Sequence, residues 1–341
     1  MYIELPISKS IANRLLILQA IHGDGLMTVS CDMPDDVRIM SEAIRLLGER
    51  REARIDLGNC GTAMRFLTAY CAQLEGQTTI LDGIERMRHR PIGQLVDALR
   101  EIGADIEYLG EEGFPPLRIK GCILDKHRIV TINNPQSTQY ISALLLIGAN
   151  VITNSTSPYI YITQEVIKQY QFSPFSFHLT VEKDWSSAAF WYEYVTLHGG
   201  EITLPGLSRD SLQGDKVVAD IFAQLGVTTQ YMEEGIVIYP SPLQSTTYTL
   251  HQDFSACPDL YPAVALTCER LGVELHATGV ESLPLKESDR LRAVREHRTD
   301  ADHRMAMALL VAGYEVDDTV CISKSYPQFI EQWKSVNGFN E

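Results

Sequence analysis

The 341 residues suffice for two domains of ordinary size, and 45% of them are hydrophobic, as in a globular protein. The formal net charge of −15 argues against a nucleic-acid partner, because binding a phosphate backbone needs a basic surface. No apolar run could span a bilayer and the start, MYIELPISKS, does not form a signal peptide, so we expect a cytoplasmic protein with no membrane partner. The seven scattered cysteines include no CxxC pair, so neither a disulfide framework nor a metal site is expected.

Two kinds of helical segment alternate along the chain. The first kind opens with small polar residues and continues with apolar residues at helical spacing. Its members are residues 8–21, 58–72, 135–148, 184–195, 256–272 and 300–313. The second kind is amphipathic and often ends on a glycine that can cap the helix. Its members are residues 35–48, 90–103, 161–170, 212–226, 286–297 and 326–335.

Short runs rich in β-branched residues separate these helices and predict strands. The clearest are residues 117–121, 128–132, 235–240 and 247–250. Six pairs of helices with strands between them imply six α/β units, three in each domain. Their spacing is too irregular for a solenoid, which keeps a fixed period.

Two joints in this pattern are too short. Residues 103–135 and 226–256 each leave room for about three strands, whereas residues 170–184 leave room for little more than one. After residue 297, only three residues precede the next helix. Either the protein has deletions at these joints, or mobile loops are missing from the sequence. We favour missing loops, because REHRTDADHRM would join two helices without a recognisable turn.

Several helix starts are suited to binding anions, because the first N–H groups of a helix are unpaired. Three of them carry polar or basic residues: Lys9, Ser10 and Arg14; Asn59, Gly61 and Thr62; and Ser137, Thr138 and Gln139. Neither the P-loop pattern nor GxGxxG is present, so no nucleotide-binding motif is indicated.

Cations recur in polar turns of a chain that is otherwise acidic. They are Arg86, Arg88, Arg90, Lys286, Arg290, Arg304 and Lys324. Each alone could be a solvated side chain, but the set fits a ligand with phosphate and carboxylate groups. Asp259 and Glu287 lie among these cations and could act as general bases or only cap helices. His303 could take part in proton transfer or simply orient Asp302.

The turn GNCGT, residues 58–62, raises the question whether Cys60 is a nucleophile. We expect the anion-binding residues to be Asn59, Gly61 and Thr62. Cys60 is then a small, buried, alanine-sized residue.

The chain resembles the 5-enolpyruvylshikimate-3-phosphate synthase family over nearly its whole length. The resemblance rests on motifs that follow the family's order: SKSIANRLLILQA, GNCGTAMRFLTA, ERMRHRPIGQLVDALREIGA, STQYISALL, PYIYIT, VEKDWSSAAFWYE, LQGD, CPDLYPA, KESDRLRA, DHRMAMA and SKSYPQF.

This resemblance implies an α/β fold of two similar globular domains, each built from three βαβαββ units in a pseudo-threefold arrangement. The active site would lie in the interdomain cleft, which ligands would draw closed. Domain I would comprise residues 1–8 plus 214–341, and domain II residues 9–213. We expect a monomer.

The implied reaction transfers the enolpyruvyl group of phosphoenolpyruvate to the 5-hydroxyl of shikimate 3-phosphate by addition and elimination, with no metal or organic cofactor. The catalytic residues would be Asp259, Glu287 and Lys9, with the proton steps among them left open. Shikimate 3-phosphate would bind Lys9, Ser10, Arg14, Ser137, Thr138, Gln139, Thr156, Asp259, Ser282 and Lys286. Phosphoenolpyruvate would bind Lys9, Asn59, Gly61, Arg90, Gln139, Arg290, Arg304 and Lys324.

The chain departs from the family's usual residues at four places. Cys60 replaces an alanine, Thr138 and Thr156 replace serines, and Ser282 stands where some members have asparagine. Gly61 is expected to leave room beside the phosphoenolpyruvate site, which would make the enzyme sensitive to glyphosate.

Two alternatives remain. One is the related enzyme that transfers enolpyruvyl to UDP-N-acetylglucosamine and uses a cysteine on a mobile loop. The other is a non-catalytic anion-binding relative.

Overall fold

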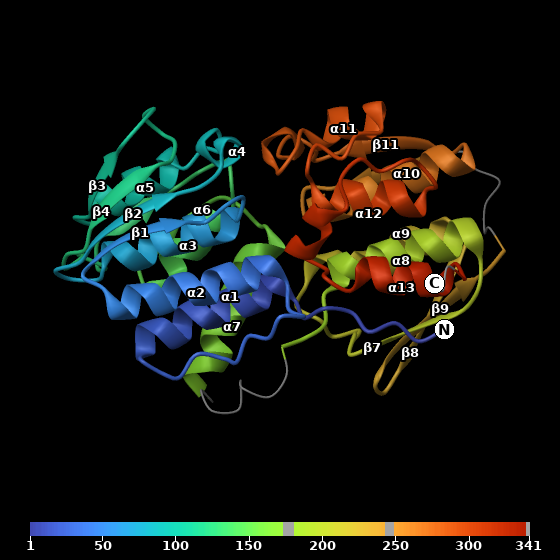
Figure 1. Cartoon of the computed structure of the whole chain (residues 1–341), viewed down its shortest axis with the longest axis horizontal. Helices are drawn as coiled ribbons and strands as arrows, with labels where there is room; N and C mark the ends of the chain where they lie inside the picture. Colours follow the sequence, from blue (N-terminus) through green and yellow to red (C-terminus); the bar gives the residue numbers. More distant parts are fainter. Residues whose placement is uncertain (173–180, 243–248, 339–341) are drawn as a thin grey trace. The chain divides into compact units, whose positions relative to one another are not determined.

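The computed structural model describes residues 1–172, 181–242 and 249–338 (Figure 1). The α-helices are α1 Lys9–His22, α2 Asp35–Glu49, α3 Gly61–Ala72, α4 Glu85–Arg88, α5 Gly93–Glu101, α6 Gln139–Leu146, α7 Pro158–Phe172, α8 Trp185–His198, α9 Val218–Gln224, α10 Tyr261–Leu271, α11 Arg290–Glu296, α12 His303–Val311 and α13 Phe329–Val336. The strands are β1 Glu52–Asp56, β2 Thr78–Asp82, β3 Asp105–Tyr108, β4 Leu117–Lys120, β5 Ile129–Thr131, β6 Asn150–Ile152, β7 Ile202–Pro205, β8 Val227–Met232, β9 Gly235–Pro240, β10 Thr249–Asp253 and β11 Glu274–Thr278. Short 3-10 helices are η2 Gly214–Val217, η3 Pro258–Leu260, η4 Leu283–Leu285 and η5 Val320–Lys324.

The chain folds into two compact units. The central unit comprises Lys9–Cys31 and Asp36–Val181, and the C-terminal unit comprises Met1–Ser8, Asp32–Asp35 and Glu182–Glu341. The predicted boundary between residues 213 and 214 is wrong, because the chain changes unit between Val181 and Glu182. The physical reason is α8, which packs against α10 and α12, while β7 pairs with β9.

Three helices form the interior of each unit. In the central unit α1, α3 and α6 contact one another, and in the C-terminal unit α8, α10 and α12 do the same. Every residue of α8 from Trp185 to Val195 is buried. A helix that is apolar on all sides is stable only when neighbouring elements cover it all round. These six helices are the first kind that the sequence predicts, which confirms that part of the prediction.

The outer helices bury only one stripe. In α2 the buried apolar residues include Val37, Met40, Ile44 and Leu47, at the three- and four-residue spacing of one helix face. The second kind of predicted helix corresponds to α2, α5, α7, α9, α11 and α13. None of the helices in the described ranges is both long and apolar enough to cross a bilayer.

The sheets lie outside these helices. β1 runs parallel to β2, which pairs antiparallel with β4, and β4 pairs antiparallel with β3. Together with α3 and α5 these strands form one complete βαβαββ unit, with the short α4 inserted before α5 (Figure 1). The C-terminal unit repeats the order, because Tyr2 bridges in parallel to Thr203 of β7, and β9 lies between β7 and β8.

The strand predictions are confirmed where the structure describes them. Residues 117–121, 128–132 and 235–240 contain β4, β5 and β9. The two long links contain three strands each, β3 to β5 and β8 to β10. Of the predicted strand 247–250, residues 249 and 250 begin β10, and the other two lie outside the described residues.

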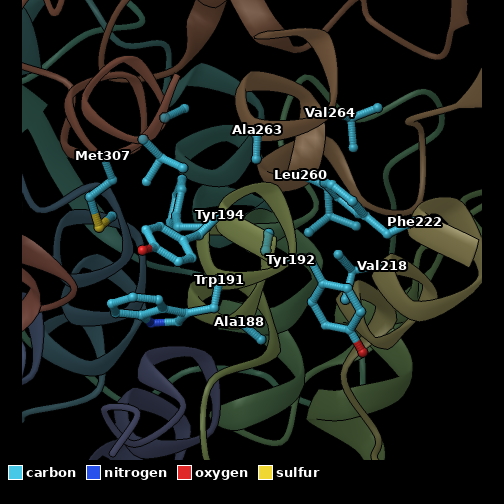
Figure 2. Packing of buried hydrophobic residues seen from close by; sticks show 14 of the residues in the cluster. Ala188, Trp191, Tyr192, Tyr194, Val218, Phe222, Leu260, Ala263, Val264 and Met307 are labelled. Carbon is cyan, nitrogen blue, oxygen red and sulfur yellow. The ribbon is translucent and has the colours of Figure 1, made fainter. Parts of the chain in front are cut away.

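Aromatic side chains of α8 fill the core of the C-terminal unit. Figure 2 shows Tyr192 beside Val218 and Phe222 of α9, and the Tyr192 and Phe222 rings are 5.6 Å apart. The indole N–H of Trp191 donates a 3.1 Å hydrogen bond to the Tyr326 hydroxyl. A buried Trp or Tyr needs such a partner for its polar end. The core therefore fixes α8 both by apolar packing and by hydrogen bonding.

The joint after α11 is as short as the sequence indicates. α11 ends at Glu296 and α12 begins at His303. The connection includes three non-glycine residues with positive φ: His297, Asp300 and Ala301. The left-handed region costs such residues about 1–2 kcal/mol each, so the turn is strained. Most of the other short joint, residues 170–184, lies outside the described residues.

One carboxyl group is buried inside α8 without a charged neighbour. Glu193 is fully buried, and neither of its oxygens has a hydrogen-bond partner among the residues that the structure describes. Burial raises the pKa of Glu193 well above its ordinary value. Glu193 therefore keeps its proton in the folded protein under conditions where the unfolded chain loses it.

We expect the C-terminal unit to become less stable as pH rises above the ordinary glutamate pKa of about 4.3, because unfolding then releases the proton of Glu193. Glu193→Gln cannot titrate, so its free energy of unfolding should exceed that of wild type by about 1–3 kcal/mol at pH 8 and converge with it near pH 4. Urea unfolding at both pH values measures this. Glu234→Gln on the surface is the control, and equal pH dependence in wild type and Glu193→Gln would contradict the prediction.

Candidate active site

The predicted site residues form two clusters, one in each unit. In the central unit, the starts of α1 and α2 meet where Lys9 Nζ lies 3.0 Å from Asp36 Oδ2. The Asp36 carboxylate is almost fully buried and the Lys9 side chain is 15% exposed. The ion pair with this buried carboxylate orients the ammonium group of Lys9.

Arg14 is buried and ties α1 to α6 and α7. Its guanidinium donates to Thr163 Oγ1 (2.7 Å), Ser142 Oγ (3.2 Å) and the backbone carbonyl of Tyr159 (3.1 Å). A fourth hydrogen bond of 2.6 Å goes to the carbonyl of Ser10, one helical turn earlier. Burial lowers the pKa of Arg14 to about 10, which still leaves it charged at neutral pH. Arg14 thus holds the helix start that carries Ser10.

The GNCGT turn begins α3. Gly58 has φ +54°, which a glycine adopts without strain, and its N–H donates to Asp56. Cys60 caps the helix, because its sulfur accepts from the N–H of Ala63 at 3.4 Å. Its side chain is fully buried. The prediction that Cys60 is a small buried residue is confirmed.

Gly61 lies against two arginine side chains. A Cβ atom at this position would be 2.6 and 2.7 Å from the two terminal nitrogens of Arg90 and 2.8 Å from Nη1 of Arg65. The expected open space beside Gly61 is therefore filled by guanidinium groups. The glycine is required because it lets these cations approach the backbone.

The start of α6 joins this arrangement. The side-chain amide of Gln139 donates to Thr62 Oγ1 at 3.0 Å, which links α6 to the start of α3. Ser137 Oγ accepts from the N–H of Gln139 at 3.3 Å. Thr138 occupies the cap position, but its hydroxyl makes no capping hydrogen bond. These contacts bring Gln139, Thr62 and Ser137 to one place.

Thr156 lies apart from these contacts, in a shallow pocket before α7. The pocket has a volume of about 380 Å³, and its polar wall includes Ser155, Thr156 and Ser157. Arg88 is directed elsewhere, because its guanidinium pairs with Asp82 at 2.9 Å on the surface. Thr156 is thus accessible to a ligand. Arg88 is instead a solvated surface cation, as the sequence analysis allowed for each cation taken alone.

The cluster of the C-terminal unit is centred on Arg290, which is fully buried. Its guanidinium lies 2.8 Å from Asp259 Oδ1, 2.8 Å from Asp302 Oδ2 and 3.1 Å from Glu287 Oε2. Burial alone would lower the pKa of Arg290, but these three carboxylates raise it above its ordinary value. One cation therefore fixes three acids that come from separate segments of the chain.

Two of these acids bind further cations. Asp259, in η3, also accepts from Arg304 Nη2 at 2.9 Å and lies 3.5 Å from Lys286 Nζ. Glu287 accepts from Lys324 Nζ at 2.9 Å. The sequence predicted Arg290 and the five residues Asp259, Glu287, Arg304, Lys286 and Lys324 as site residues, but it did not predict which of them pair. Asp302 completes the cluster and also caps α12, because its Oδ1 accepts from the N–H of Arg304. The cluster combines strong anion-binding groups with carboxylates that can accept a proton.

Two further candidates of this unit are Ser282 and His303. Ser282 stands before η4, and its side chain makes no capping hydrogen bond there. His303 is buried, with Nδ1 3.6 Å from Asp302 Oδ1. This contact agrees with the alternative in which His303 orients Asp302.

Asp215 is a functional candidate that the sequence analysis did not single out. Burial and the charge of Asp259 together raise the pKa of Asp215 to about 7, and Arg304 opposes both effects. The Ser186 hydroxyl donates to Asp215 Oδ2. A carboxyl that titrates near neutrality therefore borders Asp259. Asp215 is the last residue of the LQGD motif, and this position could have identified it as a candidate from the sequence.

The sequence prediction also missed two residues that contact predicted site residues, Arg65 and Asp36. Arg65 follows Gly61 by four residues and so shares its helix face, a spacing that could have revealed it. Asp36 belongs to a pair of acids at the start of α2. In the described part of the chain, no group of His, Cys, Asp and Glu side chains is arranged to hold a metal ion.

Comparison with known proteins identifies the family. The model described as "EPSP synthase (3-phosphoshikimate 1-carboxyvinyltransferase)" matches residues 2–298 and 295–333. A protein of Bacteroides fragilis named 3-phosphoshikimate 1-carboxyvinyltransferase is 39% identical over 390 residues, covering 96% of this chain and 93% of the relative. A Colwellia psychrerythraea protein of the same name is 30% identical over 422 residues, covering 98% and 96%.

These alignments bear on the short joints. Both are longer than the 341 residues of the chain, so they contain positions at which this sequence has no residue. The family match is interrupted at residues 295–298, next to the strained turn after α11. The sequence is therefore short at this joint relative to the family.

A solved structure supports the fold. EPSP synthase from Acinetobacter baumannii superposes with a TM-score of 0.68 at 18% sequence identity, covering 98% of this chain and 95% of the other. The α/β fold with two similar domains is thus confirmed. With the family model matching nearly the whole chain, the chain belongs to the EPSP synthase family.

Proposed function

We propose that the chain is a 3-phosphoshikimate 1-carboxyvinyltransferase, which transfers the enolpyruvyl group of phosphoenolpyruvate to the 5-hydroxyl of shikimate 3-phosphate and releases phosphate. The relatives that carry this name match almost the entire chain. The observation that carries the proposal within the structure is the position of Asp259 between Arg290 and Arg304. It places an acceptor for a hydroxyl proton among cations that suit phosphate and carboxylate oxygens.

The cations are assigned to the two anionic substrates. Shikimate 3-phosphate is assigned to Lys9, Ser10, Arg14, Ser137, Thr138, Gln139, Thr156, Asp259, Ser282 and Lys286. Phosphoenolpyruvate is assigned to Lys9, Asn59, Gly61, Arg90, Gln139, Arg290, Arg304 and Lys324. Arg90 and Arg304 are both buried, so an anion that reaches them exchanges water for charged hydrogen bonds.

The addition step needs one proton removed and one supplied. We assign Asp259 to accept the proton of the 5-hydroxyl as its oxygen attacks C2 of phosphoenolpyruvate, while C3 gains a proton. Lys9 and Glu287 are the candidates for the proton at C3. Elimination then removes a proton from C3 and expels phosphate from C2, so the balance of atoms leaves only the enolpyruvyl ether and phosphate.

Asp259 can accept a proton readily only when Arg290 and Arg304 bind another anion in its place. In the structure its carboxylate is bonded to Arg290 and Arg304, which stabilises the unprotonated form. When a substrate anion takes over those guanidinium groups, Asp259 loses part of that stabilisation and its affinity for a proton rises. Binding and base activation are thereby coupled.

The alternative that uses UDP-N-acetylglucosamine is not favoured. That enzyme needs a reactive cysteine, and reactivity requires a thiolate. Burial raises the pKa values of the thiols of Cys71, Cys257, Cys268 and Cys321 to about 12, and Cys60 is fully buried. The other two cysteines, Cys31 and Cys122, lie outside the helix starts that carry the candidate site residues. The monomeric state and cytoplasmic location remain part of this proposal, and light scattering on the purified protein tests the former.

The direct test is phosphate release from phosphoenolpyruvate by the purified protein. We expect release with shikimate 3-phosphate as the acceptor and none with UDP-N-acetylglucosamine. Release with the second acceptor alone would overturn the proposal, and release with neither would favour a non-catalytic relative.

Asp259→Asn should reduce kcat by about 100-fold or more, because the amide cannot accept the hydroxyl proton. Substrate affinities should change far less, since Arg290 and Arg304 keep their charges. Steady-state kinetics and direct binding of phosphoenolpyruvate measure the two effects. Asp220→Asn, on the exposed side of α9, is the control. Equal losses of turnover and affinity would instead indicate a binding role.

Gly61→Ala should raise KM for phosphoenolpyruvate by about tenfold, or 1.4 kcal/mol, because the new methyl group displaces the guanidinium of Arg90. Wild type should be inhibited by glyphosate in competition with phosphoenolpyruvate, and Gly61→Ala should need more inhibitor. Gly48→Ala is the matched control, because nothing lies within 4 Å of its new Cβ. An unchanged KM in Gly61→Ala would contradict the expectation.

Cys60→Ala should retain most of the activity, since the thiol is a buried cap and makes no step of the reaction. The loss of one weak hydrogen bond to Ala63 and a small volume should cost about 1 kcal/mol of stability. Kinetics and thermal unfolding measure both. A loss of turnover by more than tenfold with a folded protein would restore Cys60 as a catalytic candidate.

A further inference from the structure

Arg65 is a buried arginine next to the phosphoenolpyruvate residues to which the family resemblance assigns no role. It lies on α3, four residues after Gly61, and is only 3% exposed. An arginine is seldom buried without a specific reason, because the charge must be removed from water. Its contacts indicate what that reason is.

The two ends of the Arg65 fork hold backbone carbonyls on either side of the site. Nη1 donates to the carbonyl of Gly61 at 3.2 Å, and Nη2 donates to the carbonyl of Pro91 at 2.9 Å. Pro91 directly follows Arg90. The same Pro91 carbonyl accepts a 2.6 Å hydrogen bond from the hydroxyl of Tyr140 on α6. The peptide next to Arg90 is therefore fixed by one donor from α3 and one from α6.

The charges of Arg65 and Arg90 lie side by side. Nitrogens of both guanidinium groups are within 2.8 Å of the point where a Cβ of Gly61 would stand. Both charges also act on Tyr140, because burial raises the pKa of that hydroxyl while Arg65 and Arg90 oppose the rise. Two neighbouring cations repel each other, and in a buried setting the repulsion is weakly screened. An anion bound by Arg90 relieves that repulsion.

We propose that Arg65 is a positioning residue for phosphoenolpyruvate: it fixes the Arg90 segment through Pro91 and adds a second positive charge behind the Arg90 guanidinium. This inference rests on the proposed function, in which Arg90 binds phosphoenolpyruvate. Arg65 acts through Arg90 and Gly61 rather than on the reacting atoms. Its loss should therefore weaken phosphoenolpyruvate binding selectively.

The test compares Arg65→Gln and Arg65→Lys in the full chain. In Arg65→Gln, KM for phosphoenolpyruvate should rise 10- to 100-fold, while KM for shikimate 3-phosphate stays within twofold and kcat within about threefold. Arg65→Lys keeps the charge but loses the fork, so it should recover part of the affinity. Arg100→Gln is the control, because Arg100 also donates to a backbone carbonyl, that of Ile106, in the same unit.

The outcomes separate this inference from the proposed function. Wild type without phosphate release defeats the proposed function itself. An active wild type with unchanged phosphoenolpyruvate KM in Arg65→Gln, or with equal changes for both substrates, defeats only the role of Arg65. If Arg65→Gln does not fold, Arg65→Lys decides: a 3- to 10-fold rise in KM for phosphoenolpyruvate alone supports the proposal, and an unchanged KM overturns it.

Discussion

The burial of the apolar middle of three helices in each unit is the constraint from which the rest of the structure follows. A helix such as α8, apolar on every side, must be surrounded, so the amphipathic helices and the sheets are driven to the outside. The polar starts of the inner helices cannot be covered in the same way, because their N–H groups need partners. Many of the candidate site residues therefore lie at or next to the starts of the inner helices, where apolar packing ends.

The same constraint explains the unusual charge distribution. A protein with a net charge of −15 keeps Arg14, Arg65, Arg290 and Arg304 away from water. Arg14, Arg65 and Arg304 lie in the first half of an inner helix, and Arg290 begins the outer helix α11. All four donate to carbonyls or carboxylates. Burying them costs solvation, and only multiple short hydrogen bonds offset that cost. Within each unit, the buried arginines are therefore held in fixed positions by the groups that accept their hydrogen bonds.

Periodicity predicted the helices because the inner and outer kinds differ in their hydrophobic patterns, and strands such as β9 alternate clearly. The family resemblance placed the domain crossover at Gly214 rather than Glu182, since sequence carries no record of which unit α8 packs into. The cations of the site could be named from motifs. Their partners could not, because Arg290 meets Asp259 and Asp302 only through tertiary contacts. Asp215 was missed since its significance lies in its burial.

The ion pairs of Asp259 also bear on selectivity. Arg290 and Arg304 are already paired with the carboxylate of Asp259, so an anion that binds them must displace this carboxylate. Chloride or a simple carboxylate has too few oxygens and too little charge to do so. A ligand that presents a phosphate and a carboxylate together gains several bonds at once, as in any multivalent exchange. The Asp259 carboxylate therefore sets the free energy that any anion must supply before it can bind these two arginines.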